Sequence, residues 1–390
     1  FGMPIGRFEG IEEPLARIGA SAYWMDATRR LTLGAVDAGE RPAVLSAIVK
    51  AYLTEGMRST VNDAMDVQAG GGISRGPRNS LAGAYQAVPV GITVEGANIL
   101  TRTLIIYGQG AIRCHPWVQK QMSAIAAKDL VAFDHALFGH LGMVASNALR
   151  SLAYGLTGGA LAPSPVGGAA GDAIRRLART SANFALVSDA AMATLGGALK
   201  RKEKISGRLA DALAWMYVAS ATVKRFVDDG QPEREWPYFQ YSMDNAFFKA
   251  QTALVGVLDN LPNRPAAWAL RVAVFPFGPR WKAPSDALGS KVAKSLLDDR
   301  ETRARLTGDI YIPSKEHHGL GRLEDAYEKA LAARSVERKL RDAVKSGHLS
   351  KPGKNGDGAL SAAVEKGVLT AAEAELVKAA VAARLDVIQV

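Results

Sequence analysis

Apolar side chains recur at intervals of three and four positions along most of this chain, and this period restricts the folds open to it. From Phe8 to Val36 one face is apolar and the opposite face carries charges. The apolar face comprises Ile11, Leu15, Ile18, Ala22 and Met25. Such spacing is typical of an amphipathic helix, whereas a half-buried strand alternates every second residue. Alternation of Val, Ile and Thr is scarce, so we predict an all-α fold.

The same period predicts helices along almost the whole chain of 390 residues. We expect them at residues 8–36, 43–68, 81–87, 97–126, 128–156, 172–199, 206–229, 234–261 and 320–346. A tail helix follows, because Thr370 and Glu373 have the spacing of a capping box. Residues 262–315 are rich in proline and are expected to be irregular. The charge-free stretch 151–171 holds six Gly and two Pro, so we expect a loop there and no membrane span.

Breaks in this pattern suggest four segments. Residues 1–125 are expected to form a bundle of helices joined by short links, and residues 126–349 a second helical region. Residues 350–358 are expected to be a flexible linker, followed by a helical tail at 359–390. A chain of this length has room for two or three domains with cores of their own.

Charge and cysteine content narrow the classes of partner. The formal net charge of +10 favours anionic partners. No basic stretch is interleaved with aromatic residues as in a nucleic-acid platform, so we expect no nucleic-acid partner. Cys114 is the only cysteine, which excludes an intrachain disulfide and a Cys-rich metal site. His115 follows it without further ligands at metal spacing, and we therefore predict no metal site.

A single carboxylate, Glu95, interrupts the apolar stretch VGITVEGANILTR at residues 90–102. Two interpretations are open. Glu95 is either an acid favoured by the positive end of a helix dipole, or a general base held in a dry pocket. In the second case the apolar residues Val88, Val90, Ile92 and Val94 would form the dry wall, because desolvation makes a carboxylate a stronger base.

The segment AGGGIS at residues 69–74 also has two interpretations. Three glycines are common where a helix ends in a turn. They also let a ligand approach the backbone closely, because glycine has no side chain.

Three stretches of the first 120 residues together resemble the C-terminal helical domain of the acyl-CoA dehydrogenases. They are FGMPI at residues 1–5, DVQAGGGI at 66–73 and VEGANILTR at 94–102. The stretch YGQGAIRCHPWV at residues 107–118 is similar to the bacterial long-chain type, whose chain continues into a large C-terminal extension. The specific likeness covers about residues 1–125.

The resemblance implies roles for particular residues. Glu95 would be the base that abstracts the α-proton, and Glu95 and Gly96 would contact the acyl-CoA substrate. Phe1, Asp66, Ala69, Gly70, Ala97 and Ile99 would lie at the FAD cofactor. Three positions depart from the family pattern, which has Gln at Asp66, Gly at Ala69 and Thr at Ala97.

The resemblance also implies an activity and partners. The chain is expected to be the C-terminal part of a flavoenzyme that oxidises medium- to long-chain acyl-CoA to trans-2-enoyl-CoA in β-oxidation. It would need the N-terminal half of the same enzyme, form a homodimer or higher homo-oligomer, and pass electrons to an electron-transfer flavoprotein. The expected location is the bacterial cytoplasm or the inner membrane surface. The alternatives are an acyl-CoA oxidase-like enzyme and a non-catalytic membrane-docking scaffold.

One stretch of the extension combines aromatic and basic residues. Between Arg264 and Lys282 it carries Trp268, Phe275, Phe277 and Trp281. It is too short to span a bilayer. It either lies at an anionic lipid surface as a peripheral membrane contact or packs onto the bundle with its arginines reaching solvent.

Overall fold

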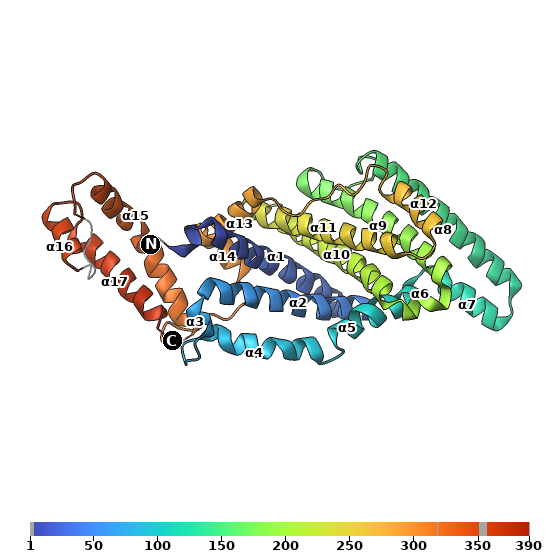
Figure 1. The fold of residues 1–390 in the computed structure, drawn as a ribbon, viewed down its shortest axis with the longest axis horizontal. Coiled ribbons are helices and arrows are strands. Elements are labelled where there is room, and N and C mark those ends of the chain that lie inside the picture. Colours follow the sequence, from blue (N-terminus) through green and yellow to red (C-terminus); the bar gives the residue numbers. More distant parts are fainter. Residues whose placement is uncertain (1–3, 318, 351–356, 390) are drawn as a thin grey trace. The chain divides into compact units, whose positions relative to one another are not determined.

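A computed structural model describes residues 4–317, 319–350 and 357–389, and in this part of the chain every regular element is a helix (Figure 1). The all-α prediction is confirmed. Phe1 lies outside the described residues, as does most of the linker expected at 350–358.

The described chain begins with the short 3-10 turn η1 (Ile5–Arg7). Two long helices follow it, α1 (Glu9–Asp37) and α2 (Ala43–Gln68). Both were predicted. The buried face of α1, however, is offset from the predicted apolar stripe and comprises Ala16, Gly19, Ala20, Tyr23, Trp24, Ala27, Thr28 and Thr32. Small residues predominate on this face because α1 packs closely against α10 and α13.

The region around Glu95 differs from prediction at both ends. The elements are α3 (Gly70–Ile73), α4 (Ser80–Thr93), α5 (Asn98–Leu100), the π-helix η2 (Thr101–Gln109), α6 (Gly110–Cys114) and α7 (Val118–Ala127). The short helix expected at 81–87 continues through Pro89 to Thr93. The long helix expected at 97–126 is broken, because Pro116 holds His115 in an extended conformation.

The middle of the chain follows the prediction closely. Its helices are α8 (Leu130–Leu156), α9 (Gly168–Leu195), η3 (Gly196–Arg201), α10 (Glu203–Asp228), η4 (Glu233–Glu235) and α11 (Trp236–Asn260). The loop expected at 151–171 is shorter than predicted, since α8 and α9 extend into it. Helices α10 and α11 lie side by side and, together with α9, build the main core (Figure 1). The largest side chains buried there include Leu209, Tyr238, Phe239, Met243, Phe247, Leu254 and Leu258.

In the described part of the chain, the helical span 168–201 alone has the length and apolar composition of a membrane span. It packs against α8, α10 and α11 and buries Arg179, Asn183 and Asp189. Those contacts are typical of the core helix of a folded domain.

Residues 262–315 were predicted to be irregular, and this prediction is wrong. They form α12 (Arg264–Val274), α13 (Asp286–Asp298) and α14 (Arg300–Leu306). Each helix begins at a side-chain cap, provided by Asn263, Ser285 and Asp299 in turn. Such caps satisfy the free backbone N–H groups of the first turn, so short helices tolerate the prolines that separate them.

The aromatic and basic stretch 264–282 is divided between core and surface. Phe275 is buried, and Trp281 packs against the core with both its backbone N–H and its carbonyl bonded to the Gln251 side chain. Arg271 pairs with Asp259. Trp268, Val272 and Phe277 remain exposed, with Trp268 71% accessible. The packing interpretation therefore holds for Phe275 and Trp281, and only the exposed residues stay candidates for a lipid contact.

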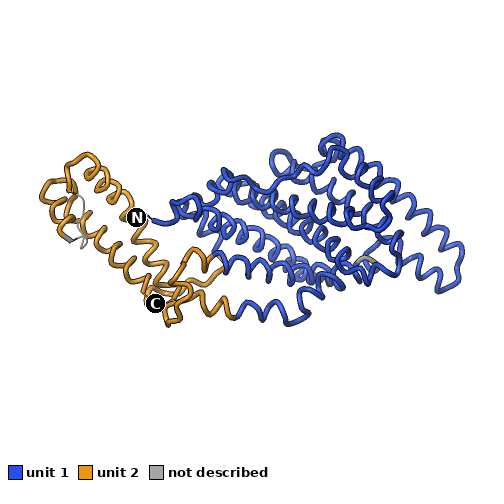
Figure 2. The backbone as a smooth tube through the Cα atoms, in the orientation of Figure 1, with its two compact units in different colours: residues 1–63, 87–307 blue, residues 64–86, 308–390 orange. Residues whose placement is uncertain are grey.

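The chain divides into two compact units (Figure 2). The first comprises residues 1–63 and 87–307, and the second comprises residues 64–86 and 308–390. The second unit contains α15 (Leu320–Lys345), α16 (Asp357–Glu365) and α17 (Ala371–Val387). The predicted capping box at Thr370 and Glu373 is confirmed. The segment boundaries expected at 125, 349 and 358 stay predictions.

Candidate active site at the Glu95 turn

A tight turn at residues 94–97 carries Glu95 between α4 and α5. The backbone of Glu95 has φ +54° and that of Gly96 has φ +91°. Glycine adopts positive φ without steric cost, but a residue with a long side chain does so rarely. A left-handed glutamate persists only where its surroundings fix it, and such residues cluster at functional sites.

The surroundings that fix this turn come from α2. The Lys50 ammonium donates to the Gly96 carbonyl at 2.7 Å and to Asn98 Oδ1 at 2.8 Å. The buried Asn98 amide in turn donates to Thr54 Oγ1 at 2.9 Å and to Glu55 Oε1 at 3.0 Å. Lys50 and Asn98 therefore clamp the turn to α2.

The Glu95 carboxylate is exposed and accepts no hydrogen bond from the residues that the structure describes. Its backbone N–H likewise has no acceptor there. Val88, Val90, Ile92 and Val94 do not enclose the carboxylate within the described residues, so the dry wall expected from them stays a prediction for the complete enzyme. Because α4 continues to Thr93, Val88 faces the interior while Val90 and Val94 are 58% and 48% exposed.

Several residues close to Glu95 in the chain are apolar and exposed. Besides Val90 and Val94, the residues that follow the turn expose Ile99, at 79%, and Leu100. Ala97, which precedes them, is exposed as well. An apolar patch with a single unpaired carboxylate is unusual on a surface that faces only water.

The glycine-rich loop belongs to the second unit and is organised by Asn79. The Asn79 amide donates to the carbonyls of Gly71, Gly72 and Ser74, while its oxygen accepts from the first N–H groups of α4. The positive φ of the loop lies at Ala69, with φ +53° and ψ −131°. Gly70 has open space around the position of a Cβ atom, so nothing within the described chain requires glycine there.

The predicted site residues thus fall into two groups. Glu95, Gly96, Ala97 and Ile99 lie together at one turn of the first unit. The exposed Asp66, with Ala69 and Gly70, lies in the loop of the second unit.

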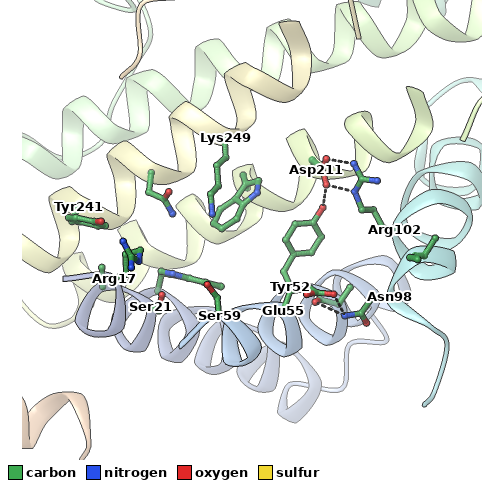
Figure 3. Close-up of a pocket in the computed structure, with 17 residues that line it drawn as sticks. Arg17, Ser21, Tyr52, Glu55, Ser59, Asn98, Arg102, Asp211, Tyr241 and Lys249 are labelled. Atoms are coloured by element: carbon green, nitrogen blue, oxygen red, sulfur yellow. Dashed lines mark hydrogen bonds and ion pairs between the residues drawn. The ribbon is translucent and has the colours of Figure 1, made fainter. Parts of the chain in front are cut away.

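Next to the turn, a cavity of about 440 Å³ opens among α1, α2, α10 and α11 (Figure 3). Asn98, Ile99 and Arg102 form the side of it that follows the Glu95 turn. Arg102 makes a two-pronged ion pair with Asp211, with Nε 2.6 Å from Oδ1, and the Tyr52 hydroxyl donates to the same oxygen at 2.5 Å. Burial and the neighbouring Asp211 carboxylate raise the pKa of Tyr52.

A second polar cluster lies elsewhere in the first unit. His115 Nε2 and His140 Nε2 lie 2.9 Å and 3.3 Å from one oxygen of the buried Asp189, so the three residues are close enough to share a metal ion. His115 Nδ1, however, accepts from the backbone N–H groups of Trp117 and Val118. The ring proton therefore sits on Nε2, where a metal would have to bind, and the arrangement suits a hydrogen-bonded network better than coordination.

Sequence reasoning missed the residues that hold the site in place. Lys50 and Asn98 are 48 positions apart, as the hydrogen bond between them records, and Arg102 and Asp211 are 109 apart. Asn98 offered a signal, since it is a polar residue within an apolar stretch, two positions after Gly96.

Comparisons with known proteins agree with this architecture. Residues 112–390 match the family model described as acyl-CoA dehydrogenase, C-terminal, bacterial type, and residues 1–108 match that of the acyl-CoA dehydrogenase C-terminal domain. The chain is similar to the solved structure of an acyl-CoA dehydrogenase complexed with FAD from Bacillus anthracis, with a TM-score of 0.57 and 17% identity. The similarity covers 77% of this chain and 50% of that one, so the chain spans about half the length of the protein it matches.

Because Lys50 clamps the Glu95 turn to α2, we predict that Lys50→Met destabilises the fold. The substitution removes two hydrogen bonds from a charged donor, so we expect the free energy of unfolding to fall by about 1.5–3 kcal/mol. Amide hydrogen exchange should accelerate at residues 95–101. Lys224→Met, which removes an exposed lysine paired with Asp228, is the control and should change stability by less than about 0.5 kcal/mol. Equal, small effects of both substitutions would contradict the clamp.

The strained backbone of Ala69 predicts that Ala69→Gly stabilises the fold. Relief of its unfavourable φ and ψ should raise the free energy of unfolding by about 1 kcal/mol, measured by denaturant titration. Ala332→Gly, at an exposed position within α15, should instead lower it by about 1 kcal/mol. If Ala69→Gly is as destabilising as Ala332→Gly, the loop is not strained at Ala69.

Proposed function

Because the chain belongs to the acyl-CoA dehydrogenases, with the bacterial-type C-terminal region, we propose that it supplies the catalytic base of an FAD-dependent enzyme. That enzyme would oxidise medium- to long-chain acyl-CoA to trans-2-enoyl-CoA in fatty-acid β-oxidation. One observation carries the proposal: the Glu95 carboxylate, which has no partner among the described residues, stands on a strained turn that α2 clamps in place.

The proposed step is abstraction of the α-proton next to the thioester carbonyl by the Glu95 carboxylate. A base for this step must be free of other hydrogen bonds, and Glu95 has none among the described residues. The unbonded backbone N–H of Glu95 is a suitable donor for the thioester carbonyl, whose oxygen gains negative charge as the proton leaves. Lys50, by holding the Gly96 carbonyl, positions both groups.

The exposed apolar residues around Glu95 support completion of this site from outside the chain. Val90, Val94, Ile99 and Leu100 are suited to packing against other parts of the enzyme, namely its N-terminal half. That packing would exclude water from the carboxylate and strengthen it as a base.

FAD is the proposed cofactor, and its chemistry would be to accept the hydride from the β-carbon. The residues proposed to contact it are Ala97 and Ile99 beside the base, and Asp66, Ala69 and Gly70 in the glycine-rich loop. All five are exposed, and Gly70 leaves its backbone open to close approach. Phe1 is proposed as a further contact on the sequence alone.

Partners and location complete the proposal. An electron-transfer flavoprotein would accept the electrons, and oxygen consumption during turnover would instead mark an oxidase. A homodimer or higher homo-oligomer in the bacterial cytoplasm is proposed from the family resemblance.

Peripheral contact with the inner membrane is proposed for the exposed residues of the stretch 264–282. Trp268, Val272 and Phe277 project from α12 and the segment after it, and Arg280 stacks on the Phe277 ring at 4.6 Å. Aromatic residues beside basic ones suit the headgroup region of an anionic bilayer.

The base assignment predicts that Glu95→Gln in the complete enzyme lowers turnover by at least ~10²-fold, because the amide keeps the shape but cannot take a proton. Bound flavin, measured by absorbance, should be unchanged. Glu40→Gln, on the exposed connection between α1 and α2, is the matched control and should keep full activity. Near wild-type dehydrogenation by the Glu95 variant, assayed with an artificial acceptor, would overturn the assignment.

The membrane contact predicts that Trp268→Ala combined with Phe277→Ala weakens binding to anionic vesicles by at least about tenfold, since each removes apolar area worth ~1.5–3 kcal/mol when buried. The melting temperature should not change. Phe275→Ala, in the core, should show the reverse: a lower melting temperature and unchanged co-sedimentation. Unchanged vesicle binding by the double variant would assign the stretch to folding alone.

A further inference from the structure

The cavity beside the Glu95 turn has the composition of a binding site in its own right (Figure 3). Its volume of about 440 Å³ lies within the range of about 300–1,000 Å³ typical of small-molecule sites. Aromatic rings form much of its wall, contributed by Trp24, Tyr52, Trp215 and Tyr241. Trp215 packs edge-on against both Trp24 and Tyr52, which gives the wall a fixed shape.

Most charged groups around this cavity are already neutralised within the protein. The Asp211 carboxylate accepts two hydrogen bonds from the Arg102 guanidinium and one from the Tyr52 hydroxyl. Arg17 is paired with Asp63 and with Glu13, each at 2.7 Å. These groups therefore contribute polar walls but no free charge that would attract a ligand.

Glu55 carries the remaining negative charge of the wall. Its carboxylate accepts from the Asn98 amide at 3.0 Å and lies 3.6 Å from Arg58. Its charge is thus directed toward the clamp and toward the surface side of α2.

Lys249 is the exception. Its ammonium lies 4.2 Å from the centre of the Trp215 ring, and within the described part of the chain no carboxylate is close enough to pair with it. Lys249 is exposed to solvent, yet nearby protein atoms partly desolvate its ammonium group, and this desolvation lowers the pKa of Lys249, against a smaller raising effect of Asp211. A partly desolvated cation without a counter-charge favours an anion beside it.

We propose that this cavity binds a small organic monoanion, a carboxylate with an apolar body. The carboxylate would pair with Lys249, with Asn245 beside it as a further hydrogen-bond donor, and the body would lie against Trp24 and Trp215. A single free cation matches one negative charge, which disfavours phosphate esters that carry two. The cavity lies wholly in the first unit, and the inference stands on its own charges and shape, independently of the proposed dehydrogenase activity.

The test is isothermal titration calorimetry of the full chain with benzoate and octanoate, each compared with its uncharged amide. We expect at least one of the two carboxylates to bind. The corresponding amide should bind at least about tenfold more weakly, because a hydrogen bond to a charged group is stronger than one to a neutral group. A preference for benzoate or for octanoate shows whether the cavity favours a flat aromatic or an aliphatic apolar group on the ligand.

Variants of Lys249 decide whether this residue is responsible. Lys249→Met should weaken carboxylate binding at least about tenfold, and Lys249→Arg should retain it. Lys291→Met is the matched control, because Lys291 also stacks on a tryptophan, Trp236, outside the cavity. If Lys249→Met does not fold, as judged by circular dichroism, the pH dependence of the wild-type chain replaces it. Affinity should then fall as the pH rises and Lys249 loses its proton, below the usual pH range for lysine.

Three results would overturn the proposal. They are no binding of either carboxylate at millimolar concentration, equal binding of acids and amides, and binding that Lys249→Met leaves unchanged. None of these results bears on Glu95, whose role is read from turnover.

Discussion

The ion pair between Arg102 and Asp211 joins the two parts of the chain that match separate family models. Arg102 lies in the first part and Asp211 in the second, and Tyr52 donates to the same carboxylate from α2. With α10 packed against both α1 and η2, the extension shares one core with the bundle that carries Glu95. The buried Arg225, which bonds to Asp26 and to the Tyr23 carbonyl, repeats this connection further along α10. Because these charges compensate one another in a partly buried setting, loss of either partner would leave an unpaired charge in the core.

The turn at Glu95 shows how hydrogen bonds hold a strained backbone in place. A glutamate at positive φ costs free energy, and that cost is offset by the bonds of Lys50 and Asn98 to the same few atoms. Gly96, at a larger positive φ, leads the chain directly into the next helix. The side chain therefore points outward from a rigid support rather than from a mobile loop. If Glu95 is the proposed base, its fixed backbone would lose little conformational entropy on substrate binding.

Local pattern predicted the helices well where one apolar stripe persists over many turns, as at residues 43–68 and 320–346. It failed for α12, α13 and α14, whose formation depends on caps at Asn263, Ser285 and Asp299 rather than on a long stripe. For the proposed site, the sequence singled out Glu95, whose role stays a prediction, but it did not indicate the environment of this residue. The exposure of Val90 and Val94 follows from the length of α4, and the clamp joins residues that only the fold brings together. Neither is encoded in spacing along the chain.

The π-helix η2, directly after the clamped turn, has a consequence for how this segment tolerates change. A π-helical turn holds one more residue than an α-helical turn, so it is the structural trace of a one-residue insertion. The buried Ile106 and Tyr107 lie within this stretch, and Tyr107 bonds to Ser188 on α9. Deleting one residue here would restore the ordinary helix and turn residues within the stretch by about 100° about the axis, while the helix after it kept its direction. Ile106 and Tyr107 would then leave the core while Glu95 stayed in place. Chain length within Thr101–Gln109 is thus fixed more strictly than the identity of its exposed side chains.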